Sequence, residues 1–365
     1  MVFSILNFRN VKIEKTDASS NLTSIIITII SIALGLTSGL IFLSALGYDA
    51  LDVYHGMFSN AFLNVYGFSE TLVKAIPLLL CGLAVGFAGQ IGLWNIGAEG
   101  QFYIGAFAAT GIAVYILPDA PSYIVISTML VVSIAAGAMW GLIGILPKVY
   151  WGVNEIITTL MLNYVAILWV DYLVYGPWRN PNHGFPLSLG FGENARLPTL
   201  GDTRIHMGLL FAIFSVFLIH LILTKTKWGF EMRVIGGNKK SAEYSGMSIN
   251  RNYILVMLLG ASIAGLAGMS EVAGIVYRLQ PNLSPGYGYS GIVVAWLSKL
   301  NPFGMVFMSL LFAGLLVGGF SMQAKGVPIG IVNLLQATIL FFVLSGEILT
   351  RYRLHFEYNV ILEDE

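Results

Sequence analysis

Residues 71–91 read TLVKAIPLLLCGLAVGFAGQI, and this stretch decides the fold. It is apolar almost throughout, and Lys74 is its one charged residue. A helix needs about 20 mostly apolar residues to cross the hydrocarbon core of a bilayer. The stretch therefore predicts a transmembrane helix.

Further apolar stretches lie on both sides of this one. The first follows a basic segment, but its apolar run exceeds the roughly 7–15 residues of a signal peptide, so we expect a retained helix. The shortest, residues 287–300, predicts a tilted half-helix or a re-entrant segment. The additional predicted spans are 24–46, 98–117, 122–147, 155–176, 207–224, 252–276, 287–300, 302–321 and 328–346.

The composition agrees with a membrane protein. Hydrophobic residues make up 56% of the 365 residues and charged residues 10%, where a soluble domain carries roughly 25%. The net charge of zero gives no basic surface for nucleic acid. A single cysteine, Cys81, excludes an internal disulfide and a cysteine-clustered zinc site, and we expect no metal site. The predicted fold class is an all-α integral membrane protein of about ten transmembrane helices.

The basic residues orient these spans. If both termini are cytoplasmic, about twice as many Lys and Arg residues lie inside as outside, as the positive-inside rule requires. The predicted organisation is a cytoplasmic segment 1–23, a transmembrane domain 24–346 and a cytoplasmic tail 347–365. Its largest loops are a cytoplasmic loop, 225–250, and an external loop, 177–206. The basic residues expected outside are Lys74, Arg179, Arg196, Arg204, Arg278 and Lys325.

A glycine pattern occurs twice. Residues 86–89 (GFAG) are followed by an irregular stretch and then by 100–105 (GQFYIG). Residues 265–268 (GLAG) are likewise followed by 286–291 (GYGYSG). The copies lie five spans apart, which predicts two five-helix halves of opposite orientation with interrupted helices along the substrate path. The alternative is chance recurrence in glycine-rich helices.

The energy source is expected to lie outside this chain. The ionisable residues lie near the ends of the predicted spans, which argues against ion-coupled transport and intramembrane catalysis. The nearest approach to a phosphate loop, residues 236–241 (GGNKKS), lacks the required spacing, so no ATP site and no catalytic residue are expected. An ion-coupled secondary carrier and a passive channel stay open as alternatives. The ionisable residues concerned are Lys74, Glu99, Glu155, Asp171, Glu271, Lys299 and Glu347.

The cytoplasmic loop predicts a short helix. Asn238 is a favourable N-cap and Gly246 a favourable residue just after a helix end. About two turns fit between them, with Ala242 and Tyr244 available for burial. Such a helix would suit a docking ATPase, whereas the alternative is a basic loop on the membrane surface.

Residues 233–247, RVIGGNKKSAEYSGM, resemble the cytoplasmic coupling loop of ABC importer permeases of the branched-chain amino acid, ribose and nucleoside group. Lys239 stands where that group often has proline. The resemblance implies that this loop contacts an ATPase subunit. The coupling residues it implies are Arg233, Gly236, Gly237, Asn238, Ala242, Glu243, Tyr244 and Gly246.

Two further motifs are similar to the nucleoside and simple-sugar branch of that group. They are residues 95–101 (NIGAEGQ) and 286–296 (GYGYSGIVVAW), the latter followed by NPFG at 301–304. The resemblance covers about residues 70–345. It implies a non-enzymatic permease subunit, in a bacterial plasma (inner) membrane, for nucleosides or related sugars. It also implies a second permease subunit (a copy or a paralogue), an extracytoplasmic binding protein and an ATPase that holds ATP and Mg, with no cofactor in this chain.

The two interrupted segments supply the expected substrate path. Amide and carboxylate side chains suit sugar hydroxyls or base edges, and aromatic side chains suit stacking on a flat base. The alternatives are that Asn95 and Glu99 satisfy backbone groups at a helix start and that the aromatic residues are packing anchors. The external loop is expected to contact the binding protein, or else to be a solvated polar loop. The path residues are Trp94, Asn95, Glu99, Gln101, Tyr103, Tyr289 and Trp296.

Overall fold

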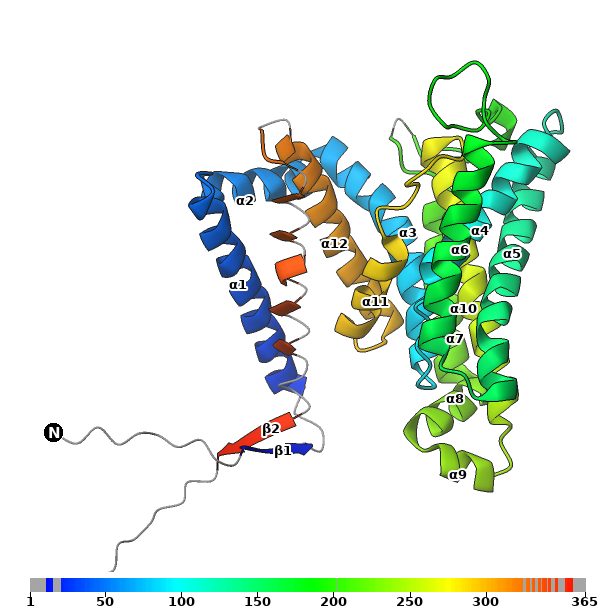
Figure 1. Cartoon of the computed structure of the whole chain (residues 1–365). Coiled ribbons are helices and arrows are strands. Elements are labelled where there is room, and N and C mark those ends of the chain that lie inside the picture. Colours follow the sequence, from blue (N-terminus) through cyan, green and yellow to red (C-terminus); the bar gives the residue numbers. More distant parts are fainter. Residues whose placement is uncertain are drawn as a thin grey trace, which may run out of the picture. The chain divides into compact units, whose positions relative to one another are not determined.

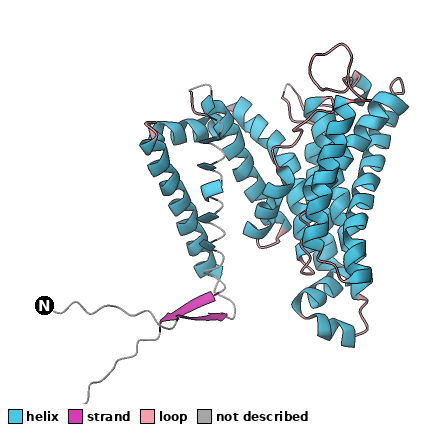
Figure 2. Cartoon of the chain, viewed as in Figure 1, coloured by secondary structure: helices cyan, strands magenta, loops and turns pink. Residues whose placement is uncertain are grey.

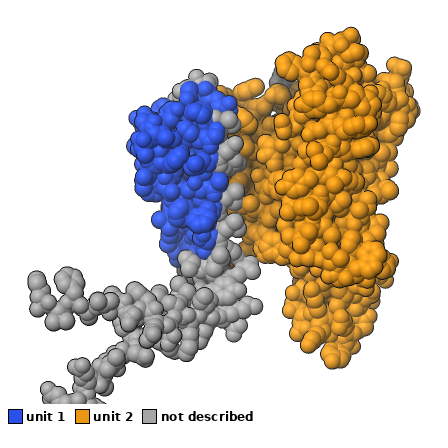
Figure 3. Space-filling model, viewed as in Figure 1, with its two compact units in different colours: residues 1–55, 322–365 blue, residues 56–321 orange. Residues whose placement is uncertain are grey.

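The computed structural model describes residues 11–15, 21–201, 203–323 and 352–356, together with part of the stretch 326–346. The chain divides into two compact units, one formed by residues 1–55 with 322–365 and the other by residues 56–321 (Figure 3). The sites discussed below lie within residues 56–321.

Most of the described chain is helical (Figure 2). The α-helices, labelled in Figure 1, are α1 (Asn21–Ala45), α2 (Ala50–Phe58), α3 (Val65–Gly89), α4 (Ala98–Thr110), α5 (Ser122–Trp151), α6 (Glu155–Tyr175), α7 (Gly208–Lys225), α8 (Lys227–Gly237), α9 (Lys239–Tyr244), α10 (Ile249–Glu271), α11 (Tyr287–Leu297) and α12 (Pro302–Gln323). Short helical turns are η1 (Ser59–Leu63), η2 (Gly111–Ile116), η3 (Glu193–Ala195) and η4 (Val272–Val276).

Each predicted span up to residue 321 has a helix at its place. The predicted span 328–346 is described only in part, and almost all of its described residues are helical. The span 98–117 is α4 continued by η2, and 287–300 is the short helix α11. Among the described residues, the helices long and apolar enough to cross a membrane are Val65–Gly89, Ser122–Trp151, Glu155–Tyr175, Gly208–Lys225, Ile249–Val276 and Pro302–Gln323.

Short polar side chains begin several of these helices. The Asn64 and Asn154 side chains accept hydrogen bonds from the backbone at the starts of α3 and α6. Thr226 and Ser248 do the same for α8 and α10. Each cap satisfies a backbone donor that the helix itself leaves unpaired, which fixes where the helix begins.

Helices α3 and α10 form the centre of the second unit. In their most apolar stretches 83% and 72% of the residues are buried, compared with 28–39% in α5, α6, α7 and α12. Helices α3 and α10 pack against each other, α4 packs against α10, and α11 packs against α3. A hydrophobic helix that is buried all round belongs in the interior of a bundle.

The crossing of α4 and α10 depends on small residues. A Cβ atom on Gly105 would lie 2.1 Å from the Gly265 carbonyl oxygen, and one on Gly268 would lie 2.0 Å from the Phe102 carbonyl oxygen. Only glycine lets two backbones approach this closely, which is how helices commonly associate in membranes. The GLAG pattern is therefore a packing surface for α4.

One element departs from the all-α prediction. Strand β1 (Val11–Lys15) pairs antiparallel with β2 (Tyr352–Phe356), within the first unit (Figure 2). The register places Ile13 opposite Leu354. Both segments alternate apolar and polar residues, a pattern typical of strands, but sequence analysis assigned them to separate tails.

Candidate functional site

The first interrupted segment lies between α3 and α4. It turns at Gly92, whose φ of 74° is in the left-handed region. Asn95 and Gln101 then exchange two side-chain hydrogen bonds, with nitrogen–oxygen distances of 3.0 and 2.9 Å. Each of these residues is only 1% exposed. Their amides therefore satisfy each other across the start of α4.

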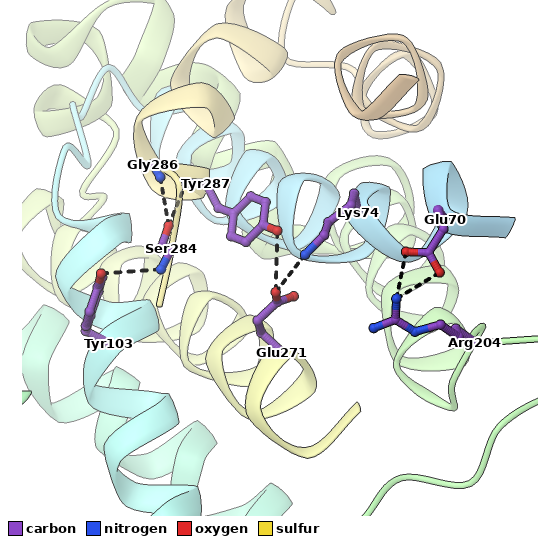
Figure 4. A network of polar contacts seen from close by, with 8 residues as sticks. All are labelled: Glu70, Lys74, Tyr103, Arg204, Glu271, Ser284, Gly286 and Tyr287. Atoms are coloured by element: carbon purple, nitrogen blue, oxygen red, sulfur yellow. Dashed lines mark hydrogen bonds and ion pairs between the residues drawn. The ribbon is translucent and has the colours of Figure 1, made fainter. Parts of the chain in front are cut away.

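The second interrupted segment lies between η4 and α11. It ends at Gly286, whose φ is 94°. The Ser284 hydroxyl accepts hydrogen bonds from the Gly286 and Tyr287 amides at 3.0 and 2.8 Å, and so caps α11 (Figure 4). The Ser284 amide donates to the Tyr103 hydroxyl of α4 at 3.3 Å. The start of α11 is thus held against α4.

The starts of α4 and α11 meet directly. The Gly288 amide donates to Glu99 Oε2 at 2.6 Å, and a Cβ on Gly288 would lie 2.2 Å from the Glu99 nitrogen. Glu99 is 2% exposed. The first turn of a helix carries partial positive charge, which favours a carboxylate there. Glu99 therefore links the two interrupted segments through the backbone of α11.

Asn163 of α6 fastens this junction from a third helix. Its Oδ1 accepts from the Gly100 amide at 2.8 Å, and its Nδ2 donates to the Ile96 carbonyl at 2.8 Å. The same Nδ2 donates to the Tyr289 hydroxyl at 3.4 Å. Sequence analysis missed Asn163. An amide in the middle of a mostly apolar span was the available signal, because a buried polar group needs partners.

A second polar cluster lies where α3, α10 and α11 meet (Figure 4). Lys74 Nζ is 3.0 Å from Glu271 Oε1, with side chains that are 24% and 2% exposed. The Tyr287 hydroxyl donates to the same Glu271 oxygen at 3.4 Å. Glu271 Oε2 has no hydrogen-bond partner among the described residues. Sequence analysis placed Lys74 and Glu271 near span ends and did not foresee either their pairing or the burial of Glu271.

The aromatic path residues differ in exposure. Trp94, from the first interrupted segment, and Trp296, from the last turn of α11, stack with ring centroids 4.7 Å apart at an interplanar angle of 27°. Trp94 is 41% exposed and Tyr289 37%, whereas Tyr103 is 2% exposed. Of the predicted path residues, the rings of Trp94, Tyr289 and Trp296 are thus partly accessible. The others are buried within the chain, namely Asn95, Glu99, Gln101 and Tyr103.

The predicted cytoplasmic helix is present as α9. The Asn238 side chain accepts from the Ser241 amide at 3.2 Å, and Gly246 follows the helix with a φ of 74°. Ala242 is fully buried, but Tyr244 is 93% exposed, although both were expected to be available for burial. The capping prediction is confirmed. The exposed Tyr244 ring is a large apolar surface at the tip of the loop.

The predicted external loop is packed rather than free. The amides of Ser188, Phe191 and Leu197 donate to carbonyls of residues 273–279 at 2.8–3.0 Å. The Arg196 guanidinium lies 4.8 Å from the centre of the Tyr277 ring. An exposed ion pair joins Arg204 to Glu70 at 3.1 Å (Figure 4). The loop therefore forms a fixed cover at the end of α10.

His206 ends this loop in a buried position. It is 1% exposed, and its Nδ1 accepts from the Gly208 amide at 3.1 Å. Burial lowers the pKa of His206 to about 4, and the positive charges of Lys74 and Arg204 act in the same direction. The imidazole is consequently neutral at physiological pH.

The fold and these sites define a multi-pass helical membrane permease. The chain belongs to the family described as the permease component of branched-chain amino acid transport systems, whose sequence model matches residues 67–344. The prediction of a permease subunit of an ABC importer is thereby confirmed.

Several relatives match most of the chain. A glucose ABC transporter permease protein, TsgB13 of Haloferax volcanii, is 37% identical over 89% of this chain and 88% of its own length. A guanosine ABC transporter permease protein, NupP of Bacillus subtilis, is 32% identical over 89% and 94%. A nucleoside ABC transporter permease protein, NupB of Lactococcus lactis subsp. cremoris, is 29% identical over 87% and 90%.

Proposed function

We propose that this permease forms the path for nucleosides or related simple sugars in an importer with a separate ATPase, a second permease subunit and an extracytoplasmic binding protein. The relatives' names, which specify glucose, guanosine and nucleoside transport, support this substrate range. The observation that carries the proposal is the docking element α9, because neither a channel nor a secondary carrier needs one.

The ATPase docks on α9. Ala242 anchors the helix in its own chain, whereas Tyr244 projects its ring outward and is flanked by charged Glu243 and Lys240. An exposed aromatic ring with a charged rim is typical of an interface hot spot. ATP and Mg belong to the partner in this arrangement, and this chain has no catalytic role.

The substrate passes the partly exposed rings of Trp94, Tyr289 and Trp296. Stacking on aromatic rings suits both a nucleobase and the apolar face of a sugar ring, so the rings fit both substrate classes. The buried Asn95–Gln101 pair is part of the scaffold behind them. The second permease subunit closes the other side of the path, and the packed external loop receives the binding protein.

The chain has ten spans in two inverted halves, with both termini cytoplasmic, and resides in the bacterial inner membrane. Pairing of β1 with β2 supports termini on one side, since two strands can pair only when both chain ends lie on the same side of the bilayer. In the inverted repeat, α3 corresponds to α10 and α4 to α11. The packing of α4 on α10 therefore has its counterpart in the packing of α11 on α3, which supports the inverted halves.

Reconstitution tests the transport mechanism. The chain is placed in proteoliposomes with its candidate ATPase, second permease and binding protein, and uptake of labelled guanosine, uridine and glucose is measured with ATP. We expect uptake that requires both ATP and the ATPase. Full uptake by the permease alone, driven by a proton or sodium gradient, would instead establish the secondary carrier.

The docking site is tested by Tyr244→Ala, which removes the exposed ring. We expect ATPase binding, measured on nanodiscs that contain the permease, to weaken by about tenfold or more, the loss typical of a hot-spot residue. Tyr123→Ala is the matched control, because Tyr123 is also strongly exposed, at 73%, but lies at the start of α5. Equal affinity for both variants would refute docking on α9.

A further inference from the structure

The turn after α11 has a strained backbone. Lys299 and Leu300 follow each other with φ values of 50° and 60°, in the left-handed region that disfavours residues other than glycine. The Leu300 amide donates to the Ala295 carbonyl at 2.9 Å, so the turn closes the end of the helix. Helices commonly end in this way with glycine, and a strained replacement persists only where the surroundings hold it.

Gln90, at the end of α3, holds this turn. Its Nε2 donates to the Leu300 carbonyl at 2.8 Å. A Cβ on the neighbouring Gly89 would lie 2.9 Å from the Leu300 side chain. The last turn of α3 and the last turn of α11 are therefore fastened through one side-chain amide and a close packing contact.

Helix α8 rests on the same residue from the other side. A Cβ on Gly236 would lie 2.2 Å from the Gln90 carbonyl oxygen, so the two backbones touch. At the other end of α8, the Trp228 and Phe87 rings pack edge to face, with centroids 5.5 Å apart. The Trp228 indole also donates to Asn252 Oδ1 of α10 at 2.8 Å. Helix α8, which leads directly into α9, is thus seated on the ends of α3 and α10.

We propose that Gln90 is a positioning residue that transmits movement of the docking segment α8–α9 to α11, with the strained turn at 299–300 as the hinge. The proposal rests on the proposed docking of an ATPase on α9. When the ATPase displaces α9, Gly236 moves the Gln90 backbone, and the Gln90 amide moves or releases Leu300. A strained turn has a second, relaxed conformation available, so a small displacement can switch it.

The consequence reaches the substrate path. Trp296 lies in the last turn of α11, three residues before Lys299, and stacks on Trp94. Release of the turn therefore changes the position of one ring of that stack. At the other end of α11, the Gly288–Glu99 hydrogen bond joins the moving helix to α4.

The experiment measures two quantities in the complete importer: the ratio of transport to ATP hydrolysis and the affinity of the permease for the ATPase. Gln90→Met keeps the length of the side chain but removes the donor. The number of substrate molecules transported per ATP hydrolysed should fall by about tenfold, the value of one lost hydrogen bond at the coupling step. The affinity for the ATPase should stay within about twofold of the unmodified protein. Gln323→Met, which removes an exposed amide at the end of α12, should leave both quantities unchanged.

A second variant separates a hinge from a merely structural turn. Lys299 is exposed, so Lys299→Gly changes little beyond the backbone and relieves its strain. The hinge predicts a higher melting temperature together with a lower transport-to-ATP ratio, because the resting conformation is favoured. A higher melting temperature with an unchanged ratio, or an unchanged ratio in Gln90→Met, would overturn the inference. Failure of the unmodified chain to bind the ATPase would overturn the docking proposal instead.

Discussion

Helices α4 and α11 begin in the same way but are held differently. Both follow an interrupted segment, and their first turns meet through Glu99 and Gly288. Apart from Glu99, the start of α4 is fixed by neutral groups, namely the Asn95–Gln101 amide pair and Asn163 from α6. It continues without a break into η2.

The start of α11 is held by Ser284 and, through Tyr287, by the Lys74–Glu271 ion pair. It ends at the strained turn of Lys299 and Leu300. The buried amides at the start of α4 satisfy one another's hydrogen bonds, and a fully satisfied network is rigid. The strained turn after α11 can relax to another backbone conformation, and the partly exposed Lys74 can exchange Glu271 for water. The comparison indicates that α4 is the fixed member of the pair and α11 the movable one.

The largest effect is expected at the glycine contacts of the two helices. Gly105→Ala on α4 would place a Cβ 2.1 Å from the Gly265 carbonyl oxygen, whereas Gly291→Ala on α11 would place one 2.9 Å from Cys81. We expect Gly105→Ala to lower the free energy of unfolding by about 3 kcal/mol or more and Gly291→Ala by about 1 kcal/mol. Melting temperatures in detergent measure both, and equal losses would remove the distinction between a fixed and a movable helix.

The next largest change in the free energy of unfolding is expected at the Lys74–Glu271 ion pair beside α11. Lys74→Met leaves the buried Glu271 carboxylate without its cation, whereas Glu271→Gln leaves Lys74, which reaches solvent in part. We expect a loss of about 2–3 kcal/mol for Lys74→Met and a smaller loss for Glu271→Gln. Thermal unfolding of the two variants and of the double variant provides the test. If Glu271→Gln proved the more damaging, the carboxylate would be doing more than pairing with Lys74.

Substitutions in the Asn95–Gln101 amide pair distinguish a structural role of these side chains from a role in substrate binding. Asn95→Leu or Gln101→Leu alone strands a buried amide and should cost about 1–3 kcal/mol. The double variant strands neither and should recover part of that loss in a double-mutant cycle. We expect transport by the double variant to follow its stability. A stable double variant that no longer transports would show that the amides contact substrate.

Sequence patterns located the helices because each apolar run is long and distinct. They also placed α9, since Asn238 and Gly246 are local start and stop signals that need no knowledge of tertiary contacts. The same local reasoning selected Asn95, Glu99 and Gln101 as path residues. Asn95 and Gln101 prove to pair with each other across the start of α4, which their spacing alone did not show. The partner of Glu99, Gly288, lies far away in the sequence, and only the packing of α11 against α4 showed it.

The Lys74–Glu271 pair was out of reach for a similar reason. In the sequence, each residue is a single charge near the end of a predicted span, where a charge is easily hydrated. Their pairing depends on α3 and α10 being neighbours at the centre of the bundle. Gln90 is the extreme case, because its polar side chain and its carbonyl oxygen serve two different elements, α11 and α8.

The smallest effect concerns the cover over the end of α10. His206 has a pKa of about 4 in the folded protein against 6.5 in an unfolded chain, so only the unfolded state gains a proton between these values. The stability that the neutral His206 contributes is therefore present above pH 6.5. It falls as the pH is lowered towards 4, by about 1 kcal/mol between pH 6.5 and about pH 5.5.

Melting temperatures across this range should fall less steeply in His206→Gln than in the unmodified chain. His183→Gln, an exposed position in the same loop, is the control and should keep the original slope. Identical slopes in all three proteins would mean that the buried imidazole is not the group whose protonation destabilises the folded chain.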